Sequence, residues 1–291
     1  MITETPLATW SPRFLGRRIR WNRSIIAAAA LLLVIVIPCV LAPLFARYSP
    51  IEQLDIIGLR TQPPSALHPF GTDYYSRDVL SRVLYGGRLS LSIALVATLV
   101  SVTLGTAYGA IAGYAGGMVE TVMMRILDAL LSIPRLLLLI AIFAAWQQVP
   151  IEWFVVIVGF TGWYGLSRIV RGQVLAIKHE DYVVSARALG AGRRRIVLRH
   201  ILPNLLTPII VATALGVGHV ILLETGLSYL GVGVPVPQAS WGSIIQDGAE
   251  NITTYWWISF FPGMAIVLTV MAFNALGDAF REALQPKGAQ S

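Results

Sequence analysis

The chain has 291 residues, of which 56% are hydrophobic and only 13% are charged, and its mean hydropathy is +0.69. A soluble domain carries about 25% charged residues, so this composition excludes an ordinary soluble fold. The net charge of +7 does not indicate nucleic-acid binding, because the basic residues gather at the ends of long apolar runs, as in the cytoplasmic loops of membrane proteins. We therefore predict an all-α polytopic membrane protein with membrane lipid, and no nucleic acid, as a partner.

The first apolar run covers residues 24–46 and follows a basic N-terminal segment, residues 1–23. A signal-peptide core has only about 7–15 apolar residues, so the run is interpreted as a retained transmembrane helix. Its cysteine, Cys39, has no second cysteine in the chain with which to form a disulfide. We predict that residues 1–23 are cytoplasmic.

Residues 47–88 are polar, mixed in charge and rich in proline, which predicts an ordered extracytoplasmic segment. The second span is expected at residues 89–114. Gly105, Gly109 and Gly113 recur every fourth residue in this span and so share one helix face. Small residues on one face permit close helix–helix approach in lipid, so we predict a packing role for them.

Four further spans and a tail complete the prediction. The third span ends near Trp146 and has Pro134 as a kink or start. Arg125 and Asp128, before it, are interpreted as a structural ion pair. The other predicted segments are a fourth span at 153–174, a fifth at 205–230, an outer loop at 231–255, a sixth span at 256–276 and a cytoplasmic tail at 281–291. Residues 89–280 are thus expected to form a five-helix core.

Six spans place both termini on one side of the membrane. Most of the 22 lysine and arginine residues then fall on that same side, in the N-terminal segment, the loops and the tail. Because lysine and arginine are enriched in cytoplasmic loops, the charge distribution predicts an N-in, C-in topology.

The loop at residues 180–204 is too polar to cross a membrane but is regularly patterned. Tyr182, Ala186 and Leu189 recur at helical spacing, which predicts a short surface helix near residues 180–192. A basic stripe follows, and Pro203 is expected to break the chain before the fifth span. Periodicity alone leaves two interpretations open: the helix lies on anionic lipid, or it fits a groove of a partner protein.

This loop resembles the EAA loop of bacterial ABC importer permeases, in which Glu-Ala-Ala is followed by a glycine and then by Leu-Pro. The residues in register with that pattern are Ala186, Gly190, Leu202 and Pro203. The sequence departs from it at three positions, where Val184 replaces the glutamate, Ser185 the first alanine and His200 an isoleucine. A specific charge contact from position 184 is therefore not expected, whereas docking by shape is.

Three other stretches, at 68–95, 113–134 and 222–245, resemble the C-type permease subunits of dipeptide, oligopeptide and nickel importers. This resemblance implies a type I ABC importer permease fold in a bacterial cytoplasmic membrane. It also implies four kinds of partner: a second homologous permease subunit, two ATPase subunits, an extracytoplasmic substrate-binding protein and a peptide substrate. The residues implied for ATPase coupling are Asp181, Tyr182, Val183, Val184, Ser185, Ala186, Leu189, Gly190, Leu202 and Pro203.

The chain itself is not expected to be an enzyme or to bind a cofactor. It has no phosphate-cradling Gly-Lys-Ser/Thr sequence, so ATP and Mg²⁺ are expected on the partner ATPases. Glu224 and His219 in the fifth span are weaker candidates for the translocation path, because an ionisable group at membrane depth commonly faces a cavity or a partner. For each, the alternative interpretation is a packing role.

Three alternative functions stay open. A nickel or metal-chelate importer shares the framework, although the four histidines are scattered along the chain. A secondary transporter is disfavoured because no inverted repeat or pair of broken helices is evident. An intramembrane hydrolase is disfavoured because Ser228 lacks the glycine context of a nucleophile turn.

Overall fold

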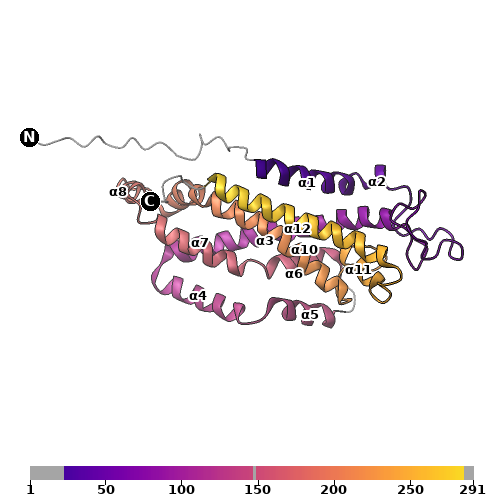
Figure 1. The fold of residues 1–291 in the computed structure, drawn as a ribbon. Helices are drawn as coiled ribbons and strands as arrows, with labels where there is room; N and C mark the ends of the chain where they lie inside the picture. Colours follow the sequence, from indigo (N-terminus) through magenta and orange to yellow (C-terminus); the bar gives the residue numbers. More distant parts are fainter. Residues whose placement is uncertain (1–22, 147–148, 285–291) are drawn as a thin grey trace, which may run out of the picture.

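The computed structural model describes residues 23–146 and 149–284, which are helices and connecting segments with a single isolated β-bridge between Thr72 and Asp78. The predicted N-terminal segment up to residue 22 and the tail from residue 285 lie outside the described residues. Long helices run side by side, and short helices gather at both ends of the bundle (Figure 1). The elements are α1 (Arg23–Val40), α2 (Ala42–Phe45), α3 (Val79–Ala115), α4 (Gly117–Leu131), α5 (Arg135–Ala145), α6 (Ile151–Phe160), α7 (Tyr164–Ile177), α8 (Asp181–Ala188), α9 (Arg193–Ile196), the π-helix η1 (Val197–Ile201), the 3₁₀-helix η2 (Leu202–Leu205), α10 (Leu206–Tyr229), α11 (Trp241–Ala249) and α12 (Trp256–Leu284).

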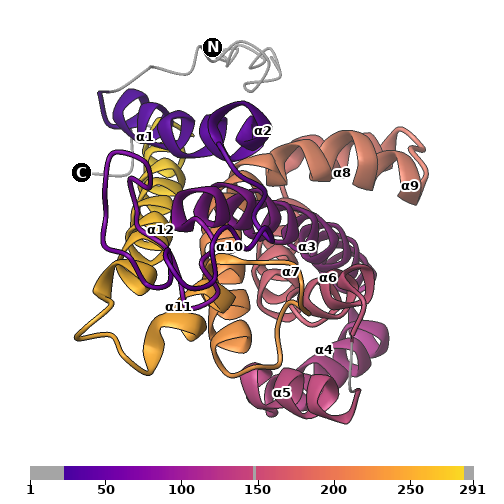
Figure 2. The ribbon, with the colours of Figure 1, turned by 90° about the vertical axis from the view of Figure 1, so that its right-hand side faces the viewer.

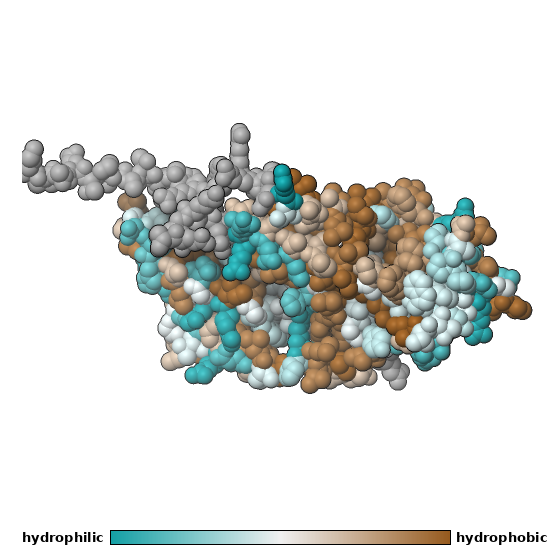
Figure 3. All heavy atoms as spheres, viewed as in Figure 1, coloured by the Kyte–Doolittle hydropathy of each residue, from teal (hydrophilic) through white to brown (hydrophobic). Residues whose placement is uncertain are grey.

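The helices provide enough apolar length for the predicted spans. Within the described residues, five helical stretches are long and apolar enough to cross a membrane, and α4 with α5 makes a sixth span if this pair, bent by 70°, is counted as one. Apolar side chains form a broad zone across the middle of the surface, with hydrophilic residues toward both ends (Figure 3). The all-α, six-span prediction therefore agrees with the structure.

Helix α3 begins ten residues before the predicted start of the second span at residue 89. Asp78 is the N-cap, and its carboxylate accepts a hydrogen bond from the Ser81 backbone N–H (2.8 Å). The polar residues that precede the apolar run are therefore helical. Hydropathy marks the apolar part of a helix, whereas this cap sets its actual beginning.

The predicted glycine face of α3 packs against α7. A Cβ added at Gly105 would lie 3.0 Å from the Trp163 carbonyl oxygen, and one added at Gly109 would lie 2.8 Å from Val170 Cβ. At Gly113 an added Cβ would lie 2.9 Å from the Arg171 carbonyl oxygen. The packing role predicted for this stripe is therefore confirmed.

The substitution Gly109→Ala is expected to destabilise the bundle, because the new methyl group overlaps α7. Overpacking of this kind costs about 1–3 kcal/mol. Gly172→Ala is the matched control, since its added Cβ would meet no other part of the described chain within 4 Å beyond its own helix backbone and chain neighbours. Thermal unfolding of the purified protein in detergent measures both effects. Equal melting temperatures for the two variants would contradict the close packing of α3 on α7.

Two neighbouring spans are interrupted near the middle of the bundle. Residues 132–134 separate α4 from α5 with a bend of 70°, and residues 161–163 separate α6 from α7. Pro134 explains the first interruption, because proline lacks the N–H that would continue a helix. The two interruptions differ, since α6 and α7 together still pass as one span of 27 residues, Ile151–Ile177, whereas α4 and α5 are sharply bent.

The outer loop at 231–255 contains a helix that the sequence analysis did not predict. Ser240 caps α11 by accepting a hydrogen bond from the Ser243 N–H, and Ser243 Oγ accepts one from the Ser240 N–H. Trp241 is buried, and its indole N–H donates to the Val83 carbonyl of α3 (2.9 Å). This loop is thus fastened to the beginning of α3.

Candidate functional site: a projecting helix and a mid-bundle cavity

Helix α8 lies at the end of the bundle opposite α11 (Figure 1) and projects sideways beyond the other helices (Figure 2). We call residues 181–196, which include α8 and α9, the α8 arm. Val183 is fully buried and belongs to a small apolar cluster with Val170 and Val174 of α7 and with Ile196. Val183 near the beginning of the arm and Ile196 at its end therefore anchor it to the bundle.

Tyr182 forms the polar part of the same anchor. Its hydroxyl accepts a hydrogen bond from Asn204 Nδ2 (3.2 Å), and Asn204 Nδ2 also donates to the His200 carbonyl (2.6 Å). Burial and, second, the charge of Glu180 raise the pKa of Tyr182 above its ordinary value. The phenol is therefore neutral at physiological pH, and it joins the arm to the beginning of the fifth span.

The outward surface of the arm is exposed. Val184 and Ser185 are exposed and Ala186 is half-buried, whereas Leu189 is 89% exposed at the end of α8. Gly190 has φ +83°, with open space around it, and thus turns the chain away from the helix. Leu189 was expected on the same face as Tyr182. As the C-cap of α8 it still donates its backbone N–H to the Ser185 carbonyl, but its side chain is exposed whereas Tyr182 is half-buried.

The helical chain does not break at Pro203, contrary to the prediction. Residues 197–201 form a π-helical turn, residues 202–205 form a 3₁₀ turn, and α10 follows directly. Such changes of hydrogen-bond pattern accommodate a proline without ending the helix, and they commonly mark functional positions. Leu202 and Pro203 therefore lie at the base of the arm and not on its exposed surface.

Two ion pairs join α4 to α7 on the arm's side of the helix breaks. Arg168 Nη2 donates to Asp128 Oδ1 (2.6 Å), and the Arg171 guanidinium donates to Glu120. The predicted pair of Asp128 with Arg125 is therefore wrong.

Glu224 is fully buried within α10 and is held by serines. Ser90 Oγ donates to Glu224 Oε2 (3.1 Å), and Ser228 Oγ donates to Glu224 Oε1 (2.7 Å). The Trp241 N–H donates in turn to Ser90 Oγ (3.2 Å). Glu224 thus connects α3, α10 and α11, and this geometry favours the packing interpretation over ligand contact.

The substitution Glu224→Gln is expected to leave transport within about twofold of wild type, because a glutamine oxygen still accepts a serine hydrogen bond. Transport in membrane vesicles, normalised to the amount of protein, measures this. A folded Glu224→Gln protein that no longer transports would instead place Glu224 in the path.

His219, the other candidate for the path, is exposed and lines a cavity of about 370 Å³. The cavity lies among α3, α5, α7 and α10, at the level of the two helix breaks. Its lining comprises Thr98, Ser101, Val102, Arg135, Gly162, Gly165, Leu166, Ile169, Ala212, Leu215, Gly216, His219 and Val220. We call it the mid-bundle cavity.

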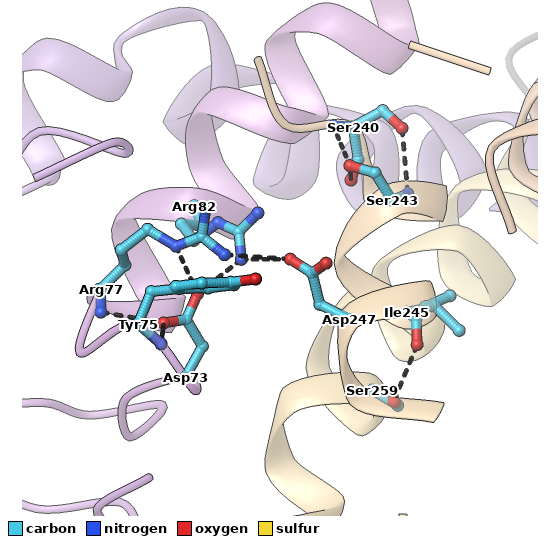
Figure 4. A network of polar contacts seen from close by, with 9 residues as sticks. All are labelled: Asp73, Tyr75, Arg77, Arg82, Ser240, Ser243, Ile245, Asp247 and Ser259. Carbon is cyan, nitrogen blue, oxygen red and sulfur yellow. Dashed lines mark hydrogen bonds and ion pairs between the residues drawn. The ribbon is translucent and has the colours of Figure 1, made fainter. Parts of the chain in front are cut away.

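At the opposite end, a network of charges joins the extracytoplasmic segment to α11 (Figure 4). Asp73 Oδ2 accepts hydrogen bonds from Arg77 Nε (2.7 Å) and Arg82 Nη1 (2.6 Å). Asp247 Oδ2 accepts from Arg82 Nη1 (2.8 Å) and Arg77 Nη2 (3.1 Å). We call these four residues the outer ion cluster. It borders a cavity of about 820 Å³, which residues 231–238 also line.

Comparison with known proteins identifies the class of molecule. Residues 105–289 match the family described as "Binding-protein-dependent transport system inner membrane component". The chain belongs to this family. It is therefore a multi-pass permease component of the inner membrane, and the resemblance stated from the EAA-like loop is confirmed.

Individual relatives match along nearly the whole permease. The dipeptide transport system permease protein DppC of Bacillus subtilis is 40% identical over 93% of this chain and 84% of its own length. The oligopeptide transport system permease protein OppC of the same organism is 38% identical over 98% of this chain and 92% of its own. A chain of the inward-facing MetNI methionine ABC transporter has the same fold, with a TM-score of 0.54 and 18% identity over 71% of this chain and 98% of that one.

Proposed function

We propose that this permease subunit imports peptides across the cytoplasmic membrane, driven by ATPase subunits that dock on the α8 arm. The observation that carries the docking is the arm itself, a short helix anchored at Tyr182 and Val183 with its outer surface exposed. The substrate class rests on the relatives, which are named for dipeptide and oligopeptide transport.

The exposed surface of the arm is suited to a protein partner. Its apolar area comes from Val184 and Leu189. The side chains of Ser185 and Ala186 are small, so a partner can approach the helix closely, and Gly190 allows the chain to turn. The exposed basic side chains that follow are Arg187, Arg193, Arg194, Arg195 and Arg199. An exposed apolar spot with a polar rim is typical of a helix that enters a groove. The basic residues favour a cytoplasmic position, and ATP with Mg²⁺ would be held by the ATPases.

The other end of the molecule would then face the substrate-binding protein. The 820 Å³ cavity opens there, beside the outer ion cluster and residues 231–238. In this arrangement residues 47–88 remain the extracytoplasmic segment and residues 89–280 the five-helix permease core. A second permease subunit completes the translocation pathway. The family match requires a binding protein, which favours an importer over a secondary transporter.

Reconstitution tests the proposal. The permease pair, the ATPases and the binding protein are placed in proteoliposomes, and radiolabelled dipeptide or ⁶³Ni²⁺ is supplied with the binding protein. We expect vanadate-sensitive accumulation of the dipeptide only when every component is present. Accumulation of nickel without peptide would support the metal-importer alternative, and accumulation without ATPases would refute the coupling.

A further inference from the structure

The mid-bundle cavity lies where two spans are interrupted. Arg135 is the first residue of α5, and Gly162 lies in the link between α6 and α7. The volume of the mid-bundle cavity, about 370 Å³, falls within the range of small-molecule pockets. Broken helices at membrane mid-depth commonly form the substrate sites of transporters, because their free ends present uncompensated polar groups.

Arg135 supplies a positive charge to this cavity. Its Nη2 donates to the Val158 carbonyl (2.7 Å) and its Nε to Thr161 Oγ1 (3.3 Å), at the end of α6. Its Nη1 makes no hydrogen bond to the part of the chain that the structure describes. An arginine at membrane depth normally has a partner of opposite charge, yet no Asp or Glu lines the cavity. One face of the guanidinium is therefore available to an anion.

Thr98 adds an independent observation. The residue is only 2% exposed and lines the cavity, but its hydroxyl has no hydrogen-bond partner among the described residues. Ser101, one turn further along α3, differs in donating to the Gly159 carbonyl (2.7 Å). An unpartnered buried hydroxyl costs free energy, and a rotation of the Thr98 side chain would turn this hydroxyl toward a ligand in the cavity. The first turn of α5 also has no side-chain cap, which adds the positive end of a helix.

We propose that the mid-bundle cavity is a transient subsite for the carboxylate of the transported peptide, bound by Arg135 Nη1 and the Thr98 hydroxyl. The inference rests on the proposed function and extends it to one chemical group of the substrate. Arginine suits this task, since its planar guanidinium holds one helix end and a carboxylate together. The subsite would favour peptides with a free C-terminal carboxylate over their amides.

The test compares alanylphenylalanine with alanylphenylalanine amide in proteoliposomes that contain the complete transporter. The binding protein is loaded to equal occupancy with each peptide, so the uptake ratio reports the permease. We expect wild type to import the free acid about tenfold faster, as loss of a charge-assisted hydrogen bond implies. Arg135→Gln is expected to bring the ratio near one, and Thr98→Val to lower it about threefold without lowering protein yield.

Arg168→Gln is the matched control, because it removes an arginine that joins the same two spans but does not line the cavity. Its ratio is expected to equal that of wild type. The subsite is refuted if wild type imports both peptides equally. It is also refuted if Thr98→Val leaves the ratio unchanged, a readout that holds even if Arg135→Gln fails to fold. Failure of wild type to import either peptide would instead refute the proposed function.

Discussion

Replacing Leu189 with aspartate is expected to abolish ATP-driven uptake while the permease remains folded in the membrane. The side chain is 89% exposed, so the substitution costs little within the subunit. At the centre of a docked interface, however, a desolvated carboxylate would cost at least about 2 kcal/mol of binding, which is roughly 30-fold in affinity. Co-purification of the ATPases and vesicle uptake measure the two consequences.

Ile57→Asp provides the matched control for this substitution. Ile57 is 92% exposed and lies in the extracytoplasmic segment, so it receives the same chemical change far from the α8 arm. It is expected to retain the ATPases. Gly190→Asp and Ala186→Glu are also expected to uncouple, but Gly190 has a positive φ and Ala186 is half-buried, so both also perturb the arm itself. ATPase retention by the Leu189→Asp protein would place the dock elsewhere.

Replacing Asp73 with asparagine is expected to destabilise the outer end of the permease strongly. Asp73 is fully buried and accepts hydrogen bonds from two arginines and from the backbone N–H groups of Tyr75 and Arg77. Asparagine keeps the shape but removes one of the two carboxylates that compensate Arg82. Breaking a buried ion pair in this way costs about 3–5 kcal/mol. The melting temperature of the purified protein in detergent is expected to fall accordingly.

Asp55→Asn is the control for this loss of charge. Asp55 lies in the same segment and is exposed. Among the described residues, its side chain accepts hydrogen bonds only from the Ile57 and Gly58 backbone N–H groups, which an asparagine oxygen also satisfies. Its melting temperature is expected to stay close to that of wild type. If Asp73→Asn melts no lower than Asp55→Asn, the outer ion cluster does not hold the extracytoplasmic segment to α11.

Hydropathy predicted which parts of the chain are helical spans, because a helix that crosses a bilayer needs a run of apolar residues, and such a run is visible in the sequence. It did not predict where α3 begins, since the cap at Asp78 lies outside the apolar run. Helix α11 was missed because it has only nine residues and its beginning depends on the reciprocal serine cap at Ser240. The interruption at Pro134 was predicted from the proline, whereas no residue pattern predicted the one near Gly162.

The candidate site was predictable in part. Helical spacing correctly predicted a short helix within the α8 arm, but periodicity does not report that Leu189 is exposed at its end. The outer ion cluster joins Arg82 to Asp247 across 165 positions, a separation that no local pattern reports. One indication of it was present in the sequence. The outer loop at 231–255 has acidic residues and no basic residue, whereas residues 47–88 have more arginines than acidic residues. The role inferred for Arg135 likewise depends on the packing of α3, α7 and α10 around it, which no local sequence pattern reports.

Site-specific photo-crosslinking tests the docking of the ATPases on the α8 arm most directly. A benzophenone amino acid is placed at position 189 of the permease in the complete transporter. A second variant of the same permease carries it at position 57. We predict a covalent adduct with an ATPase subunit from position 189 and none from position 57. Adducts with lipid alone from position 189 would contradict the account, because they would show that the arm lies on the membrane surface.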